Sequence, residues 1–366
     1  MALKCGIVGL PNVGKSTLFN ALTSAKALAA NYPFATKDPN VGMITVPDDR
    51  LDKLEALVNP QKVLPTTIEI VDIAGLIKGA SKGEGLGNQF LGNIRETDAI
   101  LHVLRCFDND NVVHVDGSVD PIRDKETIDM ELQLKDLESV EKKLDKVKRA
   151  AKTGNKEAQK EAAVLEALKS GLESGVSVRA IDTSEEDYTA FVKPLQLITD
   201  KPVMYVCNVD EAAAVEGNAY VNRVKETVKD ENAEVIFLAV GTEADITELE
   251  TFEERQLFLE DLGLTEPGSA KLIRGAYNLL DLETYFTAGE KEVRAWTIKK
   301  GATAPQAAGV IHTDFEKGFI RAEVIAYDDY VNFGSEAKVK EAGKIRVEGK
   351  EYVVQDGDVM HFRFNV

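Results

Sequence analysis

The sequence predicts an α/β fold, in which a mostly parallel sheet is wrapped by helices, with a helical insertion and a small α+β domain at the end. Short apolar runs rich in β-branched residues alternate with helical patterns, which is typical of a parallel sheet. Between residues 129 and 175 the sequence is charged and rich in Ala, Leu and Lys, with few strand formers. This stretch predicts two helices that form an antiparallel coiled-coil hairpin around a turn at Thr153–Asn155.

The predicted strands of the sheet are Lys4–Val8, Thr66–Val71, Ile100–Leu104, Val203–Cys207 and Val235–Leu238. The predicted helices outside the hairpin are Lys15–Lys26, Asn88–Thr97, Ser269–Leu282, Ala304–Thr313 and Tyr327–Phe333. The alternation of strands and helices resumes after the hairpin, so we expect the hairpin to be an insertion. The expected domains are a discontinuous one of residues 1–128 and 176–282, the hairpin of residues 129–175, and an α+β domain of residues 283–366.

Charge, apolar runs and cysteine spacing argue against several classes of protein. The formal charge of −18 argues against sequence-independent nucleic-acid binding by the chain as a whole. No apolar run is long enough for a membrane helix, so we expect a cytoplasmic protein with no membrane contact. The three cysteines are far apart and have no metal-ligand spacing, which argues against a disulfide framework or zinc site. Residues 142–160 nevertheless hold eight basic residues, so this part of the hairpin could face RNA.

The strand Lys4–Val8 leads into Gly9–Thr17, which matches the pattern GxxxxGK[ST] and is followed by a helical run. Such a loop cradles phosphates with its backbone N–H groups and with the N-terminus of the helix. We expect Lys15 to reach the β- and γ-phosphates and the Ser16 hydroxyl to bind Mg²⁺. The predicted phosphate-binding residues are Asn12, Val13, Gly14, Lys15, Ser16 and Thr17.

Two further segments fit the magnesium and γ-phosphate end of such a site. Asp72–Gly75 follows the strand Thr66–Val71, so the Asp72 carboxylate is expected beside the phosphate loop, where it would hold Mg²⁺. Gly75 would offer its N–H to the γ-phosphate. Thr36 stands where switch proteins place the residue that closes over Mg²⁺.

The residue after Gly75 is Leu76, where Ras-like enzymes have the glutamine that orients the attacking water. Leucine cannot hydrogen-bond to water. Either hydrolysis is very slow, or another polar group is brought in when a partner orders the switches. His114, in a polar loop after the strand Ile100–Leu104, is the best candidate for a catalytic, water-positioning group; a loop histidine with a structural hydrogen bond is the alternative. His102, inside that strand, is expected to be a core histidine.

The base-binding segment departs from that of a GTPase. GTPases carry Asn-Lys-x-Asp after the fifth strand, whereas this chain has Asn208–Glu211, with Val209 and Glu211 in place of the lysine and aspartate. A pocket that reads guanine through a buried polar group loses discrimination when that group changes. Asn208 remains, and an asparagine can pair with adenine. We expect Asn208, Val209 and Glu211 to bind the nucleotide and ATP to be preferred; a weakly selective GTPase is the alternative.

Together these segments resemble the YchF family of Obg-like ATPases. The matching motifs are Pro11–Ser16, Tyr32–Thr36, Asp72–Leu76, the glycine-rich run Lys78–Phe90, and Asn208–Glu211, and the resemblance covers essentially the whole chain. It implies ATP hydrolysis with Mg²⁺, a hydrophobic residue at Leu76, and a catalytic contact from His114. The final domain is similar to TGS domains.

The resemblance also implies a ribosomal partner, either the large subunit or a 70S-type particle, and the TGS-like domain would contact RNA or ribosomal protein. From its charge, the basic hairpin could add an RNA contact; a solvated helix face is the alternative. We expect a monomer. An Obg-like GTPase in ribosome assembly, and a nucleotide-gated binding protein in which hydrolysis is incidental, remain alternatives. The sequence leaves open whether a monovalent cation assists at Asn12.

Overall fold

The computed structural model describes residues 3–24, 40–73, 75, 86–231 and 233–365. The chain divides into two compact units. One unit comprises Met1–Met43 with Glu69–Leu272, and the other comprises Ile44–Ile68 with Ile273–Val366. The second unit is therefore assembled from two separate segments of the sequence.

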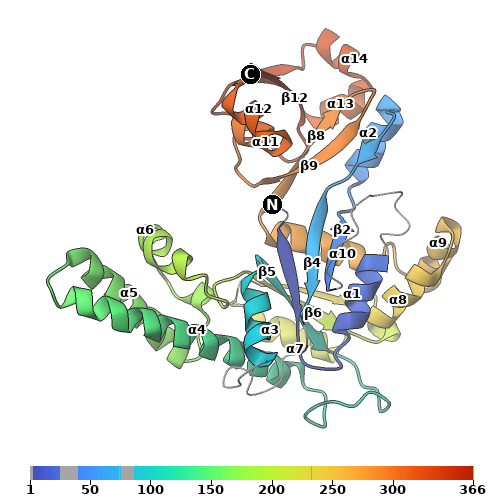
Figure 1. Cartoon of the computed structure of the whole chain (residues 1–366). Coiled ribbons are helices and arrows are strands. Elements are labelled where there is room, and N and C mark those ends of the chain that lie inside the picture. Colours follow the sequence, from blue (N-terminus) through green and yellow to red (C-terminus); the bar gives the residue numbers. More distant parts are fainter. Residues whose placement is uncertain (1–2, 25–39, 74, 76–85, 232, 366) are drawn as a thin grey trace. The chain divides into compact units, whose positions relative to one another are not determined.

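The first unit is built on a six-stranded sheet with the order β2-β4-β1-β5-β6-β7 (Figure 1). The strands are β1 Lys4–Val8, β2 Val41–Thr45, β4 Thr67–Asp72, β5 Ala99–Arg105, β6 Val203–Asn208 and β7 Glu234–Leu238. The pairs β1–β4, β1–β5, β5–β6 and β6–β7 are parallel, which confirms the predicted sheet. The carboxyl ends of these strands meet at one edge, where ligands bind in such sheets. β2 is a strand that the sequence pattern did not indicate.

Helices of this unit follow the strands as predicted, and α1 and α8 lie side by side. Their bounds are α1 Lys15–Ser24, α3 Leu86–Arg95, α4 Pro121–Ala151, α5 Lys156–Glu173, α6 Glu185–Asp187, α7 Ala219–Val228, α8 Val240–Glu248 and α9 Phe252–Asp261, with short turns η3 Val178–Ala180, η4 Tyr188–Val192, η5 Lys193–Leu195 and η6 Glu211–Ala213. α10 spans Gly268–Leu279 and not Ser269–Leu282, because Asp281 is left-handed (φ 52°) and Leu282 begins the next strand. In the described part of the chain, no helix has the length and apolar composition needed to cross a bilayer.

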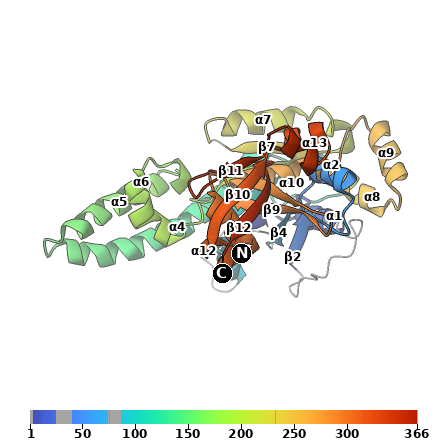
Figure 2. The same cartoon turned by 90° about the horizontal axis from the view of Figure 1, so that it is seen from above.

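The predicted helical hairpin is formed by α4 and α5, which run side by side in both views (Figures 1 and 2). Gly154 adopts φ 87° in the turn, and the Asn155 side chain accepts a hydrogen bond from the Ala158 N–H at 3.1 Å, which starts α5. The two helices share an apolar seam that includes Val140, Leu144, Val147, Ala158, Leu165, Leu168 and Leu172. The first helix begins at Pro121, well before the predicted start near residue 129, because Asp120 caps it and Pro121 fits its first turn.

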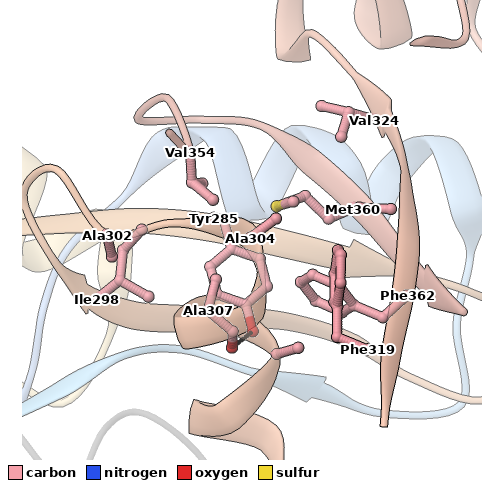
Figure 3. Packing of buried hydrophobic residues seen from close by; sticks show 12 residues of the cluster. Tyr285, Ile298, Ala302, Ala304, Ala307, Phe319, Val324, Val354, Met360 and Phe362 are labelled. Atoms are coloured by element: carbon pink, nitrogen blue, oxygen red, sulfur yellow. Dashed lines mark hydrogen bonds between the residues drawn. The ribbon is translucent and has the colours of Figure 1, made fainter. Parts of the chain in front are cut away.

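The second unit is an α/β domain built on a six-stranded mixed sheet with the order β11-β10-β12-β8-β9-β3. Its elements are α2 Asp49–Val58, β3 Val63–Leu64, β8 Leu282–Ala288, β9 Val293–Lys299, α11 Ala304–Ile311, α12 Thr313–Lys317, β10 Phe319–Ile325, α13 Tyr327–Phe333, α14 Glu336–Glu341, β11 Arg346–Glu348 and β12 Val359–Phe364. Figure 3 shows one of its two cores, in which the Tyr285 ring meets the edge of Phe362 and its hydroxyl donates to the Ala307 carbonyl at 2.9 Å.

Two segments depart from the expected domain division. Residues 44–68 and 273–282 belong to the second unit, although residues 1–128 and 176–282 were expected to form the first domain. Leu51 and Leu54 of α2 pack with Phe286 and Val293 in the other core of this unit. Arg50 pairs with the Asp356 carboxylate at 2.6 Å. These contacts join residues far apart in the sequence, so no local pattern could reveal them.

His102 is a core histidine, as predicted. It lies in β5 with 2% of its surface exposed, its ring 5.5 Å from that of Tyr205, and its Nε2 has no hydrogen-bond partner among the described residues. Burial lowers its pKa from 6.5 to about 4, an effect that Asp129 opposes and that Lys125, Arg179 and Lys15 reinforce. The folded protein therefore binds this proton less readily than the unfolded chain.

We predict that His102 makes the fold sensitive to acid. Stability from the neutral ring is present above the unfolded pKa of about 6.5 and is lost as the pH falls toward the folded value, by at most about 1.4 kcal/mol per pH unit. Replacing His102→Phe should remove this loss, so the free energy of unfolding of the wild type minus that of the variant should fall between about pH 7 and about pH 5. Urea denaturation at each pH measures this; a constant difference between the proteins would contradict it.

A second prediction concerns Asp136 of α4, which is fully buried. Its carboxylate accepts hydrogen bonds from the Ile198 N–H at 2.8 Å, and from the Thr199 N–H and hydroxyl, both at 2.7 Å. Asp136→Ala leaves three buried donors without a partner and should cost roughly 2–4 kcal/mol in unfolding free energy. Glu138→Ala on the same helix is the control: its side chain is 42% exposed and pairs with Lys135 and Lys142 at the surface, so the loss should be less than about 1 kcal/mol. Equal losses would show that Asp136 does not anchor α4.

Candidate functional site

A phosphate-binding loop connects β1 to α1 at the carboxyl edge of the first sheet. Asn12 and Gly14 adopt left-handed backbone conformations, with φ of 63° and 99°. A Cβ atom on Gly14 would lie 2.5 Å from the Asn208 amide nitrogen, so glycine is required there. Val13 is buried, while Ser16 and Thr17 are exposed in the first turn of α1. The loop and the helix N-terminus have the arrangement that binds phosphate.

Lys15 carries the positive charge of the loop. Its ammonium group donates to the Leu10 carbonyl at 2.6 Å, and the residue is only 7% exposed. Burial lowers its pKa from 10.5 to about 8, although the nearby Asp72 carboxylate raises it. A Cβ atom on Gly75 would lie 3.3 Å from the Lys15 ammonium, so Gly75 is beside this charge. A desolvated cation beside backbone N–H groups interacts strongly with an anionic ligand.

Ser16 and Asp72 are brought together from α1 and β4. The Ser16 hydroxyl donates to Asp72 Oδ2 at 3.1 Å. The other carboxylate oxygen, Oδ1, is buried without a hydrogen-bond partner among the described residues. Hydroxyl and carboxylate oxygens are the ligands that Mg²⁺ prefers, and an unpaired buried carboxylate oxygen fits a cation. The residues present therefore fit Mg²⁺. Thr36 and Leu76 lie outside the described residues.

Asn208 joins three parts of the site. Its amide nitrogen donates to the Val13 carbonyl at 2.9 Å, and its amide oxygen accepts from the Val240 N–H at 3.1 Å. Only 5% of the residue is exposed. The side chain thus ties the phosphate-binding loop to the end of β6 and to the start of α8. This is a bracing role, whereas the sequence had suggested direct pairing with the base.

The other predicted base-binding residues differ in their surroundings. Val209 is buried, and its N–H donates to the Leu238 carbonyl at 3.1 Å. The Asp210 carboxylate caps η6 by accepting from the Ala213 N–H at 3.0 Å. Glu211 is exposed in that turn. The structure therefore has no lysine to pack over a base here, and the carboxylate next to Glu211 already has a local partner.

His114 lies in a loop that contacts the phosphate-binding loop, because the Asn12 side chain donates to the Val113 carbonyl at 3.2 Å. His114 itself is 8% exposed. Its Nδ1 accepts from the Asp116 N–H at 3.1 Å, and its Nε2 is 2.8 Å from Asp124 Oδ2. Neither ring nitrogen is free to bind water in this arrangement.

Two residues near His114 were not singled out from the sequence. Arg105, at the end of β5, is 2% exposed, and its guanidinium donates to the carbonyls of Phe107, Asn109 and Val112. Asp124 is in the first turn of α4. Arg105 could have been found from the sequence, because a charged residue that ends an apolar strand is unusual and suggests a specific role. Nothing local indicated that Asp124 would meet His114.

Two family models match this chain. The family model described as 50S ribosome-binding GTPase matches residues 4–150. The model named YchF-GTPase_C, described as a protein of unknown function, matches residues 282–365. The two models thus cover the phosphate-binding loop and the second part of the other unit.

Relatives match the chain from end to end. The proteins named Ribosome-binding ATPase YchF from Haemophilus ducreyi and Bacillus subtilis are each 58% identical over 366 and 368 residues, with 100% of both chains covered. The solved structure of the Schizosaccharomyces pombe YchF GTPase is 42% identical, has a TM-score of 0.89, and covers 99% of this chain and 97% of its own. The phosphate-binding loop, the helical hairpin and the C-terminal α/β domain together with this full-length similarity establish that the chain belongs to the YchF family.

Proposed function

We propose that this protein is a ribosome-associated ATPase that hydrolyses ATP to ADP and phosphate and acts as a nucleotide-dependent switch in translation. The observation that carries the proposal is a complete phosphate-binding loop whose base-binding end lacks the groups that read guanine. The names of full-length relatives, Ribosome-binding ATPase YchF, support the same function.

At the phosphate end of the site, different residues would bind the phosphates and the Mg²⁺ ion. Lys15 and the loop N–H groups would bind the β- and γ-phosphates and stabilise the charge that develops during hydrolysis. Ser16 and Asp72 would hold Mg²⁺, with Thr36 as the proposed third residue. When bound, this ion would neutralise phosphate charge. Gly75 would offer its N–H to the γ-phosphate, which its position beside Lys15 supports.

ATP preference follows from the base-binding end. Asn208 braces the loop, so its role toward the nucleotide is to position it, with Val209 and Glu211 beside the base. The long, exposed Glu211 is a poor replacement for the aspartate that reads guanine. A weakly selective GTPase is the rival reading, and nucleotide competition separates the two.

His114 is the proposed water-positioning residue in place of Leu76. Its loop touches the phosphate-binding loop, which supports this role, but both ring nitrogens are engaged. His114 would therefore have to turn before it could assist. A nucleotide-gated binding protein with incidental hydrolysis is the second candidate function, and the engaged ring is the observation that favours it.

The hairpin is the proposed RNA contact. Four of the eight cations of residues 142–160, namely Lys142, Lys143, Lys148 and Lys160, form ion pairs with glutamate or aspartate. The other four are exposed, form no ion pair among the described residues, and lie at or near the turn: Lys146, Arg149, Lys152 and Lys156. We call these four the tip cations. Unpaired cations are the ones that can bind phosphates.

The remaining partner proposals are coarser. The ribosomal partner would be the large subunit or a 70S-type particle, and ribosome binding would make the protein cytoplasmic. The C-terminal domain, similar to TGS domains, is a further proposed contact. A monomer is expected, and assistance by a monovalent cation at Asn12 is a proposal that potassium titration can test.

We predict tighter binding of ATP than of GTP, and ATP hydrolysis that ribosomes accelerate. Binding and turnover of both nucleotides with Mg²⁺, with and without ribosomes, measure this. The double substitution Val209→Lys with Glu211→Asp restores the guanine-reading pattern and should shift the preference toward GTP by roughly tenfold or more. Because Val209 is buried, the exposed Glu211→Asp alone is the folding control. A wild-type preference for GTP would overturn the account of this pocket.

We also predict that the tip cations carry ribosome affinity. Replacing all four by alanine should weaken ribosome binding and lower the slope of log affinity against log salt by roughly 0.7–0.9 per lost phosphate contact. Cosedimentation with ribosomes over a salt series measures both effects.

The matched control is alanine at the four paired lysines of residues 142–160, namely Lys142, Lys143, Lys148 and Lys160, which removes as many charges from the same helices. Equal weakening by both sets would mean that general charge, and not the tip, is recognised. No effect from either set would remove the hairpin from the RNA contact.

A further inference from the structure

His114 sits in a compact turn at the tip of its loop. The Gly117 N–H donates to the His114 carbonyl at 3.1 Å, and Gly117 adopts φ 77° with open space around it. The stem of the same loop is held from behind, because Arg105 donates to the carbonyls of Phe107, Asn109 and Val112. The tip, residues 114–117, is closed by its own hydrogen bond, and its Asp116 carboxylate lies 3.6 Å from the Arg123 guanidinium, so the tip can turn as one piece only when that contact opens.

The contacts of the ring assign its tautomer. Nδ1 accepts from the Asp116 N–H, so in the neutral ring the proton must be on Nε2. That proton points to Asp124 Oδ2, 2.8 Å away. Both side chains are buried, with 5% and 1% exposed. A ring with one nitrogen accepting and the other donating inside the protein cannot orient a water molecule.

Asp124 is itself firmly placed. It lies in the first turn of α4, where the helix N-terminus favours a carboxylate. Its other oxygen, Oδ1, accepts from the Arg123 guanidinium at 3.1 Å. Arg123 also donates to the Ser118 carbonyl at 2.6 Å, just beyond the tip. Helix α4 thus presents a fixed, charge-balanced acceptor to His114.

The two apolar residues on either side of His114 are exposed, whereas the polar His114 ring is buried. Val113 is 75% exposed and Val115 is 49% exposed, while the polar ring between them is buried. Turning the tip would expose the ring and move Val115, the exposed valine that lies within the tip.

We propose that Asp124 is a positioning residue that holds His114 away from the attacking water, and that this contact opens before His114 assists hydrolysis. The inference rests on the proposed function, in which His114 orients water. It explains why the histidine is near the phosphate-binding loop and yet has no free nitrogen. Ribosome binding would raise turnover by favouring the open position.

The test is ATP turnover of Asp124→Ala with and without ribosomes. Removing the acceptor should raise ribosome-free turnover by roughly tenfold and reduce the stimulation by ribosomes by a similar factor. The double substitution Asp124→Ala with His114→Ala should cancel the gain. Asp124→Leu keeps most of the side-chain volume while removing both acceptor oxygens, and it replaces Asp124→Ala if that variant does not fold.

Nitrogen NMR of the four histidine rings distinguishes a purely structural role of Asp124 from the proposed positioning role. In the wild type the His114 signals should be those of the Nε2–H tautomer, and the substitution should convert them to an averaged ring, with the exposed His312 unchanged. A folded variant whose turnover does not rise would overturn the proposal, even if His114→Ala abolishes ribosome stimulation. Full stimulation in His114→Ala would instead remove His114 from the proposed function.

Discussion

The side chain of Asn208 is the contact on which the nucleotide site depends. It bonds to the Val13 carbonyl in the phosphate-binding loop and to the Val240 N–H at the start of α8, and so fixes two segments against the end of β6. The close approach explains why residue 14 must be glycine. Because both bonds are buried, they are formed in a region of low dielectric, where a missing partner is costly. Preorganised N–H groups in the loop follow from this brace.

The charges around the loop are arranged for an anion with a cation beside it. Lys15 is desolvated, and its pKa is lowered to about 8 by burial against the opposing effect of Asp72. Asp72 has one oxygen bonded to Ser16 and one buried oxygen without a partner among the described residues. Such a site is incompletely satisfied by the protein alone. Binding of a phosphate with Mg²⁺ would complete it, and this gives nucleotide binding a large electrostatic component.

The hairpin shows how a protein with a net charge of −18 can still carry a local group of cations without ion pairs among the described residues, which supports the proposed RNA contact. Acidic residues on the hairpin and on neighbouring segments pair with four of the eight cations of residues 142–160, while the four tip cations form no ion pair among the described residues. Paired and unpaired cations thus lie at different positions along the hairpin. Helix α4 carries Asp124 in its first turn and ends near the hairpin turn. One continuous helix therefore joins the tip cations to the residue that contacts His114.

The sequence by itself determined the features that are written in short, contiguous patterns. The phosphate-binding loop, the parallel strands, the hairpin and the core position of His102 all follow from neighbouring residues, because backbone geometry and periodicity are local. The tertiary structure alone decided which partners the side chains take. Asn208 forms a hydrogen bond with Val13, which is 195 positions away in the sequence. Residues 44–68 pack in the second unit, and the Asp124 carboxylate contacts the His114 ring. Such contacts depend on how distant elements pack, which no local pattern specifies.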